Sequence, residues 1–387
     1  MKILITTDWY APIINGVVTS VLNLEKELVK NGNEVKILTL SRNTHSSVSG
    51  NVIYIGSFGA GVIYPQARMK ITMKNHFISE LIDWHPDIIH SQCEFSTFLF
   101  ARHIAKALDI PIVHTYHTVY EDYTHYFSPV HKWGRSAVAK FSRWTANACQ
   151  AVIAPTQKVS EILESYNIKS PISVIPTGIN LEKFAQAGYA PNINGISEND
   201  FVCVYIGRLA KEKNVDELIK IHATMDNPRI KMLIVGDGPR RNELESLAKD
   251  CAASDKVIFT GMVKPSEVAG YYKCGNVFVS ASTSETQGLT YIEALASGLP
   301  VICRKDKCLD GVVTDCFNGF QYNTPKEYID MISKLVKNPS YNRSLSQNAY
   351  LSSENFSCRT FAINAEKLYT QAIYTYNNKF IPSLTLY

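Results

Sequence analysis

The sequence predicts an α/β protein with two doubly wound domains, each a parallel sheet covered by helices on both faces. Short runs rich in β-branched residues recur along the chain, and most are apolar throughout, which is typical of parallel strands buried on both faces. Helical patterns separate these runs, as in βαβ units. The chain has 387 residues, a length that suits two or three domains.

Apolar runs of this kind occur in both halves of the chain. The strands expected in the first half are residues 2–7, 34–40, 52–57, 87–91, 111–115 and 151–155, and those expected in the second half are residues 173–176, 201–207, 231–236, 257–260, 277–280 and 300–304. Residues 17–30 have apolar side chains at roughly helical spacing, and this helix is expected to end at Asn31-Gly32. These twelve expected strands are more than one ordinary open sheet contains. The turn-rich stretch at 170–178 and the aperiodic stretch at 185–199 mark the expected boundary between the domains.

Composition excludes several classes of protein. The formal net charge of +4 lacks the strong clustered excess of a nucleic-acid binder, so no nucleic-acid partner is expected. The nine cysteines are odd in number and form no CxxC pair, which indicates reduced thiols in a cytoplasm. The first apolar run reaches Asp8 too soon for a signal peptide. The sequence has no run of 18 or more apolar residues, so no membrane-spanning helix is expected. Peripheral contact with a membrane stays open.

Ligands of doubly wound sheets bind beyond the carboxyl ends of the strands, so the residues that follow each strand are the candidates. Arg208 follows the strand at 201–207, and Lys213 comes five residues later, just before a helix expected at about Val215. Two cations beside a helix N-terminus form an anion site that suits a diphosphate. The alternative is that these charges, Lys211 among them, are merely solvated in a loop.

The stretch SETQGLTYIEALASGLPV, at 284–301, contains two glutamates, Glu285 and Glu293. They could be an acid and base pair, metal ligands or surface charge. A helix is expected to begin near Gly288 and to end before Pro300, which leaves Glu285 in a loop and Glu293 about one turn inside the helix. The first N–H groups of such a helix suit a phosphate, and the carboxylates suit sugar and ribose hydroxyls. The pattern therefore favours hydroxyl acceptors.

Three features of the first half have a functional and a structural interpretation. Gly16 precedes a helix and permits close approach of a ligand, or it is an ordinary turn residue. His117 follows the strand at 111–115, on the edge where ligands bind, although a single histidine is often structural. The loop after it is acidic and aromatic, or simply solvated, and comprises Tyr120, Glu121, Asp122 and Tyr123. No metal site is expected, since HExxH-type spacing is absent.

The stretch HKWGRSAVAKFSRWTANACQ, at 131–150, is amphipathic at helical spacing. It is either a domain helix with its apolar side in the core or a helix that lies on an anionic bilayer. One half of the helix is expected to hold the cations Lys132, Arg135, Lys140 and Arg143, and the other half Trp133, Ala137, Val138, Phe141 and Trp144.

Four of these stretches together resemble a known family: GRLAKEKN, SETQGLTYIEALASGLPV, HTYHTVYEDYTHY and the opening TTDWYAPIINGVVTSVLNLEKELVKNG. They are similar to the retaining, nucleotide-sugar-dependent glycosyltransferases of family 4, and most of all to bacterial 1,2-diacylglycerol 3-glucosyltransferases. The resemblance implies the GT-B architecture, in which two Rossmann-like domains face each other across a cleft. It implies an acceptor-binding domain at 1–170, a nucleotide-sugar-binding domain at 171–372 and a last helix, at about 373–387, that crosses back to the first domain.

The resemblance also implies roles for individual residues. Arg208 and Lys213 would hold the donor diphosphate, Glu293 the ribose, and Glu285 the transferred sugar. The donor would further contact Gly16 and the backbone of Thr286, Gln287, Gly288, Leu289 and Thr290, while His117 would lie near the transferred sugar. His117, Glu285, Arg208 and Lys213 are the expected catalytic group.

The expected reaction transfers a hexose, glucose, from UDP-glucose to a membrane lipid such as diacylglycerol, with retention and without a metal or other cofactor. The tyrosine-rich loop and the basic helix would contact the acceptor or an anionic membrane, and the protein would lie at the inner face of the cell membrane. The alternative is a family-4 enzyme that acts on a polysaccharide or soluble acceptor.

Overall fold

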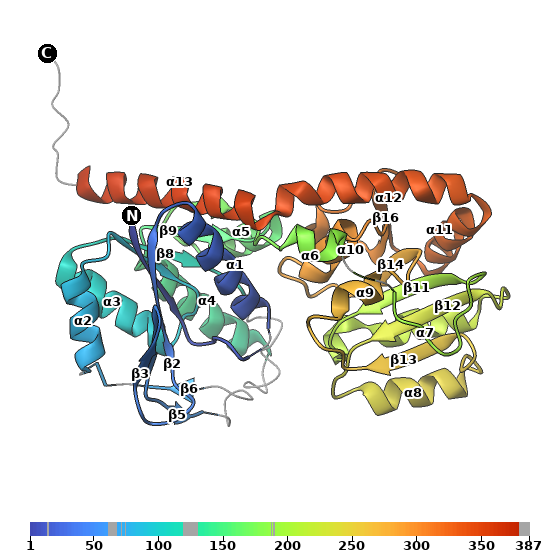
Figure 1. The fold of residues 1–387 in the computed structure, drawn as a ribbon, viewed down its shortest axis with the longest axis horizontal. Helices are drawn as coiled ribbons and strands as arrows, with labels where there is room; N and C mark the ends of the chain where they lie inside the picture. The colour runs from blue at the N-terminus through green and yellow to red at the C-terminus, as the bar shows by residue number, and fades with distance from the viewer. Residues whose placement is uncertain are drawn as a thin grey trace, which may run out of the picture. The chain divides into compact units, whose positions relative to one another are not determined.

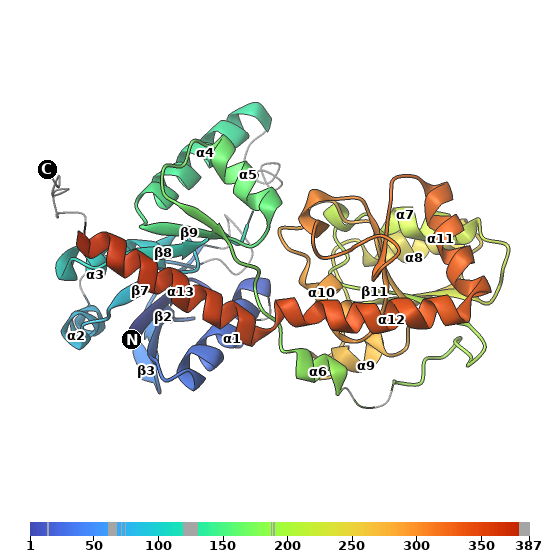
Figure 2. The same ribbon diagram turned by 90° about the horizontal axis from the view of Figure 1, so that it is seen from above.

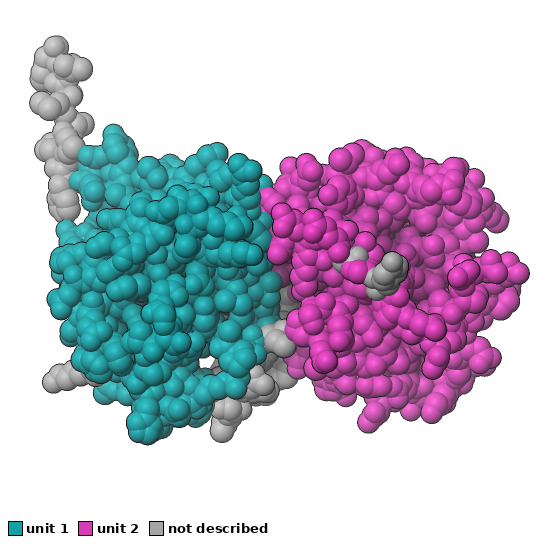
Figure 3. Space-filling view, viewed as in Figure 1, with its two compact units in different colours: residues 1–178, 358–387 teal, residues 179–357 magenta. Residues whose placement is uncertain are grey.

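The computed structural model describes residues 1–378 except residues 14, 61–67, 71, 74, 119–130, 187 and 189, and it leaves out the side chains of residues 131–133 and 135. The chain divides into two compact units, which Figure 3 shows in different colours. Unit 1 comprises Met1–Gly178 and Cys358–Tyr387, and unit 2 comprises Ile179–Ser357.

Unit 1 is built on a mostly parallel sheet, which has eight strands in the described part of the chain (Figure 1). Only β3 and β4 pair antiparallel among its neighbouring strands described here. Across the sheet the order is β10 (Ile172–Val174), β9 (Ala151–Ala154), β8 (Ile112–Thr115), β7 (Ile88–Ser91), β1 (Lys2–Thr7), β2 (Glu34–Leu40), β4 (Val52–Ile55) and β3 (Ser47–Ser49). A separate small ribbon pairs β5 (Phe58–Gly59) with β6 (Arg68–Met69).

Helices cover both faces of the unit 1 sheet, because its strands are apolar on both sides. The helices of this unit are α1 (Gly16–Lys30), α2 (His76–Trp84), α3 (Ser96–Leu108), α4 (His131–Asn147), α5 (Gln157–Ser165) and α13 (Cys358–Asn377). Ile3 and Ile5 of β1 pack in one cluster with α1 and α13, while Leu4 between them packs in another with α2 and α3. Figure 2 shows α13 running along the sheet of unit 1.

The boundaries of unit 1 differ from the predicted ones at two places. Strand β10 pairs parallel with β9, so it completes the first sheet, whereas the sequence analysis assigned it to the second half and ended the first domain at residue 170. Helix α13 begins at Cys358 rather than near residue 373. Its apolar side chains Phe361, Ala365 and Leu368 recur at helical spacing and are buried in the core of unit 1, so the helix belongs to that unit from its first turn.

Unit 2 is a fully parallel sheet, with six strands among the described residues. Their order across the sheet is β13 (Val257–Gly261), β12 (Ile230–Val235), β11 (Phe201–Ile206), β14 (Val277–Ser280), β15 (Val301–Arg304) and β16 (Gly319–Tyr322). In chain order this is 3-2-1-4-5-6, the doubly wound Rossmann arrangement. The order therefore reverses between β11 and β14.

The sheet of unit 2 separates two buried apolar clusters. Cys203 and Tyr205 of β11 face one cluster, and Val204 and Ile206 face the other. The helices around the sheet are α6 (Leu181–Ala185), α7 (Val215–Ala223), α8 (Arg241–Asp250), α9 (Val268–Tyr272), α10 (Leu289–Ala296), α11 (Pro325–Lys337) and α12 (Pro339–Ser353), with short 3₁₀ turns η2 (Lys211–Lys213), η3 (Lys307–Leu309) and η4 (Glu354–Phe356). This packing makes the sheet a rigid base for the loops at its carboxyl edge.

Every strand expected from the sequence is present, with bounds shifted by a few residues at most. Strand β16 and the short strands β3, β5 and β6 were not predicted.

Candidate active site

The candidate site of unit 2 lies where the strand order reverses. Strands β11 and β14 are neighbours and parallel, so their carboxyl ends share one edge of the sheet. Arg208 follows β11 with an exposed side chain, and the loop that contains Glu285 follows β14. Ligands of doubly wound sheets bind at such a switch point. The fold thus brings together the two stretches that the sequence analysis singled out.

Three contacts tie these two loops together. The Lys213 ammonium lies 2.5 Å from Glu285 Oε1, and both side chains are largely buried. The Asn214 amide donates to the carbonyl of Ala281 over 3.2 Å, and the Ser284 hydroxyl donates to the carbonyl of Glu212 over 3.3 Å. Lys213 was expected on the diphosphate and Glu285 on the sugar, and the structure joins them as an ion pair. Each charge therefore orients the other at the mouth of the site.

Helix α10 begins at this edge with a glycine in place of a capping side chain. Gly288 has φ +71°, a left-handed conformation that favours glycine, and no side chain caps the helix. A Cβ atom on Gly288 would lie 2.7 Å from the ring of Tyr291. Residues 286–288 lead into the helix, and Leu289 and Thr290 are its first two residues. The first N–H groups of α10 and the helix dipole suit an anion.

Glu293 lies one turn further along α10, where its carboxylate is desolvated. The Tyr272 hydroxyl donates to Glu293 Oε2 over 2.8 Å. Desolvation raises the pKa of Glu293 to about 7, although the hydrogen bond from Tyr272 and the charge of Lys183 oppose the rise. A carboxylate held in this state gains from hydroxyl donors, which a ribose would supply. The structure therefore places Glu293 as the sequence analysis expected, on the first turns of the helix that starts at Gly288.

Unit 1 has its own switch point, between β1 and β7. Asp8 follows β1, and its Oδ1 accepts from the backbone N–H of Thr97 at the start of α3, over 2.9 Å. Desolvation raises the pKa of Asp8 to about 6, against the hydrogen bonds from Thr97, and the nearby carboxylate of Glu94 raises it further. Gly16 is the first residue of α1, which Asn15 caps by accepting from the N–H of Val18.

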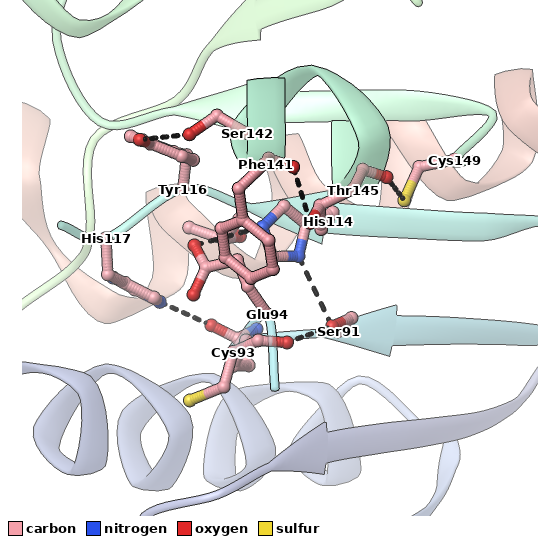
Figure 4. Close-up of polar contacts among 12 residues, drawn as sticks. Ser91, Cys93, Glu94, His114, Tyr116, His117, Phe141, Ser142, Thr145 and Cys149 are labelled. Atoms are coloured by element: carbon pink, nitrogen blue, oxygen red, sulfur yellow. Dashed lines mark hydrogen bonds and ion pairs between the residues drawn. The ribbon is translucent and has the colours of Figure 1, made fainter. Parts of the chain in front are cut away.

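Glu94, His114 and Ser91 form a buried polar network beside the carboxyl edge of the unit 1 sheet (Figure 4). His114 Nε2 lies 3.4 Å from Glu94 Oε1, and His114 Nδ1 lies 3.2 Å from Ser91 Oγ. The serine, histidine and acid resemble a hydrolytic triad in composition. However, Ser91 Oγ donates to the carbonyl of Cys93 over 2.9 Å, and all three side chains are buried. The network therefore stabilises the strand ends and offers no exposed nucleophile.

His117 follows β8 and lies next to this network. Its Nε2 is 2.6 Å from Gln92 Oε1 (Figure 4 shows the His117 side chain). Desolvation lowers the pKa of His117 to about 4, although the Glu94 charge opposes the shift. His117 is therefore neutral at pH 7. Since the amide oxygen accepts, Nε2 carries the proton and Nδ1 keeps its lone pair.

Asp8, Gln92 and Glu94 are polar residues of this edge to which the sequence analysis assigned no role. Each of them directly follows a strand or comes within three residues of its end. That position was the available signal, because the carboxyl ends of neighbouring parallel strands meet at one edge.

Helix α4 differs from its predicted division into two faces. Among the side chains of α4 that the structure describes, the buried ones are Val138, Ser142, Thr145 and Ala146, a narrower stripe than expected. Trp144 was predicted on the apolar half with Val138, but it is 44% exposed. The reason is geometric: six residues at 100° each place Trp144 about 120° from Val138 around the helix.

The exposed side of α4 forms an aromatic and cationic patch with α3. Phe95 and Leu99 are exposed here, Phe95 stacks on Phe141 at 5.7 Å, and the Arg102 guanidinium lies 5.0 Å from the ring centre of Trp144. A shallow hollow of about 430 Å³ is lined by Arg102, Lys140, Arg143, Trp144, Asn147 and Ala148. We call the following side chains, on or directly next to these two helices, the α3–α4 patch: Phe95, Leu99, Arg102, Lys140, Phe141, Arg143, Trp144, Asn147 and Ala148.

Several predicted residues lie outside the described part of the chain. They are Tyr120, Glu121, Asp122 and Tyr123, together with the side chains of Lys132, Trp133 and Arg135. Among the described residues, no cluster of histidine, cysteine and acidic side chains could hold a metal ion, and no helix is long and apolar enough to cross a membrane.

Two Rossmann-like domains with parallel sheets and the Rossmann strand order define the GT-B class of glycosyltransferase folds. Residues 14–183 match the family model for Glycosyltransferase Family 4, and residues 190–352 match the model for Glycosyl transferases group 1. The chain belongs to the family 4 glycosyltransferases, as the following relatives also indicate.

The chain is 36% identical to the alpha-monoglucosyldiacylglycerol synthase of Streptococcus pneumoniae, over 93% of this chain and 84% of the relative. It is 33% identical to the alpha-monoglucosyldiacylglycerol synthase of Acholeplasma laidlawii, over 98% of this chain and 99% of the relative. Among solved structures, Anabaena HepE in complex with UDP shares the fold, with a TM-score of 0.71 and 16% identity over 96% of this chain and all of that chain.

Proposed function

We propose that the protein is a retaining hexosyltransferase that moves glucose from UDP-glucose to a membrane lipid acceptor such as diacylglycerol. The observation that carries this proposal is whole-chain similarity to two alpha-monoglucosyldiacylglycerol synthases, combined with an anion site and a desolvated carboxylate on one edge of unit 2. The UDP bound to a protein of the same fold supports the choice of nucleotide. Unit 2 is then the donor domain, and unit 1 provides the acceptor surface.

On the donor side, each group has a chemical role that its geometry supports. Arg208, Lys213 and the N-terminus of α10 neutralise the diphosphate, and Glu293 accepts hydrogen bonds from the ribose hydroxyls. Glu285 orients Lys213 from 2.5 Å away and would lie beside the transferred sugar. These cations and the helix dipole supply the charge stabilisation that a metal ion would otherwise give, so the scheme includes no metal.

For the chemical step we propose departure of the nucleoside diphosphate from the anomeric carbon through an oxocarbenium-like transition state. Charge then grows on the β-phosphate, where Arg208, Lys213 and the start of α10 stabilise it. The acceptor hydroxyl attacks from the side that the leaving group departs from, which retains the α configuration. A phosphate oxygen of the leaving group takes the hydroxyl proton. Neutral His117 accepts a hydrogen bond at Nδ1 from a hydroxyl of the transferred sugar.

We also propose that the α3–α4 patch rests on an anionic bilayer, so that the enzyme attaches peripherally to the inner face of the cell membrane. Trp144 and Phe95 are aromatic groups suited to the interface, and Arg102, Lys140 and Arg143 are cations suited to anionic headgroups. Their joint exposure on α3 and α4 is the observation that supports a lipid acceptor over a soluble one.

A panel assay tests the donor and the acceptor. The purified protein is incubated with UDP-glucose, UDP-galactose, UDP-N-acetylglucosamine and GDP-mannose, each with diacylglycerol in mixed vesicles or with soluble oligosaccharides, and products are read by mass spectrometry. We expect monoglucosyldiacylglycerol from UDP-glucose, with an α linkage by NMR. Transfer only to the soluble acceptors would instead establish the family-4 polysaccharide or soluble-acceptor enzyme.

Vesicle flotation tests the membrane surface. Binding to vesicles with 30% anionic lipid, a composition chosen on the order of the anionic content of natural leaflets, is expected for the wild type and to fall about tenfold in Trp144→Ala. Tyr350→Ala is the matched control, because Tyr350 is also an aromatic residue with 44% exposure but lies in unit 2. Equal loss in both variants, or in neither, would contradict the α3–α4 patch as the membrane surface.

A further inference from the structure

The C-terminal helix α13 contributes a side chain to the polar edge of the unit 1 sheet. Side chains alternate along a strand, and Ile88 of β7 packs in the cluster beneath α1 and α13. His90, two residues further on, therefore points to the same face and meets Tyr369 of α13. The two rings pack edge to face, with centres 5.4 Å apart. A residue from the far end of the chain thus lies against the strand that leads to Gln92.

His90 is a fully buried histidine with both ring nitrogens in hydrogen bonds. Its Nδ1 lies 2.6 Å from the Tyr369 hydroxyl, and its Nε2 lies 2.7 Å from the Thr115 hydroxyl. Burial lowers the pKa of His90 well below its ordinary value, so the ring is neutral and one nitrogen donates while the other accepts. These two hydroxyls therefore fix where the imidazole lies, and each of them can donate to or accept from the nitrogen that it faces.

Gln92 connects His90 to His117. The Gln92 amide nitrogen lies 3.1 Å from both ring nitrogens of His90, and the amide oxygen accepts from His117 Nε2 over 2.6 Å. If the amide turned over, its nitrogen would face His117 Nε2, and His117 would then have to carry its proton on Nδ1. The orientation of Gln92 between the two rings is thus linked to the tautomer and direction of His117.

Helix α13 is well fixed in unit 1, so Tyr369 has a defined position. Phe361 and Leu368 are buried in the unit 1 core, and Asn31, at the end of α1, donates to Glu366 Oε2 over 2.8 Å. Further along, the Tyr376 hydroxyl donates to Asp109 over 2.9 Å. The hydroxyl of Tyr369 is therefore a fixed reference point for the chain of hydrogen bonds.

We propose that Tyr369 is a positioning residue for His117, acting through His90 and Gln92. The C-terminal helix would then do more than complete the core of unit 1, since it determines which nitrogen of His117 accepts a hydrogen bond. The proposal rests on the proposed function only for what His117 contacts, namely the transferred sugar. The coupling between Tyr369 and His117 itself belongs to unit 1 and is measurable without substrate.

The protein contains a matched control for this pair. In unit 2 the Tyr328 hydroxyl lies 2.8 Å from His222 Nε2, and both residues are fully buried. Their ring centres are 5.8 Å apart with an angle of 68° between the ring planes, and the corresponding angle for His90 and Tyr369 is 69°. Tyr328→Phe therefore removes the same kind of buried hydroxyl–imidazole bond as Tyr369→Phe. The two variants are expected to lower Tm to a similar extent, and only one of them is linked to His117.

The first measurement needs no activity. In protein labelled with ¹⁵N-histidine, the His117 ring signals are assigned by their loss in His117→Ala, and the wild type is expected to show one neutral tautomer with the proton on Nε2. Tyr369→Phe should shift these signals or split them between tautomers, whereas Tyr328→Phe should leave them unchanged. Unchanged His117 signals in Tyr369→Phe would overturn the proposal, and wild-type protein inactive on every sugar and acceptor would overturn only the proposed function.

A double-mutant cycle tests the consequence for transfer. Tyr369→Phe is expected to lower kcat about 10-fold to 100-fold with little change in donor KM, because misplacing a group near the reacting sugar costs rates of this order. In the His117→Ala background, the same change should lower kcat by no more than about twofold, since its target is absent. An equal fold-loss in both backgrounds would mean a merely structural effect and would refute the proposed path.

Discussion

Glu293→Gln is expected to stabilise unit 2 at alkaline pH while it weakens binding of the proposed UDP-glucose donor. The pKa of Glu293 is raised from its model-peptide value near 4.5 to about 7, mainly by desolvation. The folded state therefore binds more protons than the unfolded state between these two pH values, so stability falls as pH rises through this window. The difference between these two pKa values corresponds to a loss of about 3 kcal/mol in the free energy of unfolding above pH 7. The neutral glutamine keeps an acceptor for Tyr272 and avoids this cost.

Thermal unfolding followed by far-UV circular dichroism at pH 8 and pH 5 measures this effect. For a domain the size of unit 2, about 3 kcal/mol corresponds to a rise in Tm of about 6–12 °C at pH 8. At pH 5 the wild-type carboxyl is mostly protonated, so the two proteins should differ little. Tryptophan fluorescence gives an internal reference, because all four tryptophans lie in unit 1. Equal Tm values at pH 8, or the same gain at both pH values, would refute the reasoning.

Glu243→Gln is the control for charge removal on the same domain. Glu243 lies on α8, and the hydrogen bond from Arg240 lowers its pKa, so its substitution should give no gain at pH 8. Kinetics complete the test. Loss of the charged acceptor in Glu293→Gln should raise the donor KM about 10-fold to 100-fold, since hydrogen bonds to charged groups contribute about 1.5–3 kcal/mol. A more stable but weaker enzyme is the expected outcome.

The remaining predictions concern the diphosphate edge of unit 2. Arg208→Ala and Lys213→Ala should each lower kcat about 10²-fold to 10³-fold, as loss of transition-state charge stabilisation does, and near-normal initial rates in both would exclude the clamp. Gly288→Ala should destabilise unit 2 by about 1–3 kcal/mol in chemical denaturation, because φ +71° and the Tyr291 ring oppose a Cβ atom, and an unchanged midpoint would contradict this. Glu285→Ala should abolish most transfer with the circular dichroism spectrum intact, and a lost spectrum would instead indicate a structural role.

Much of the fold was predictable because its strands are short apolar runs with helices between them. Strand β16 was missed because Gly319–Tyr322 is only four residues long and contains the polar Gln321. The domain boundary was misplaced because turn residues around Pro171 suggested a linker, whereas β10 pairs with β9 just beyond them. Which strands pair depends on the tertiary structure, so a local sequence pattern does not predict it.

The grouping of the candidate residues at the carboxyl edge of unit 2 was predictable for a different reason. Lys213, Gly288 and Glu293 lie close to one another in sequence or follow neighbouring strands, so strand ends and helix starts were enough to group them. The ion pair between Lys213 and Glu285 was not foreseen, because it depends on how two loops 72 residues apart meet in space. No local sequence pattern could have connected Tyr369 to His117, because they are 252 residues apart in the chain. The path between them runs through the side chains of His90 and Gln92.

Helix α13 has a consequence for how the protein is made. Unit 1 begins at the first residue, yet its last helix follows the whole of unit 2 in the chain. At the usual elongation rate of about 5–20 residues per second, synthesis of Ile179–Ser357 takes about 10–40 s. During that interval the nascent first domain lacks the α13 side chains that share a core with Ile3, Ile88 and Val113. The second domain therefore has the time to fold first, and the first domain is completed only after α13 has been made.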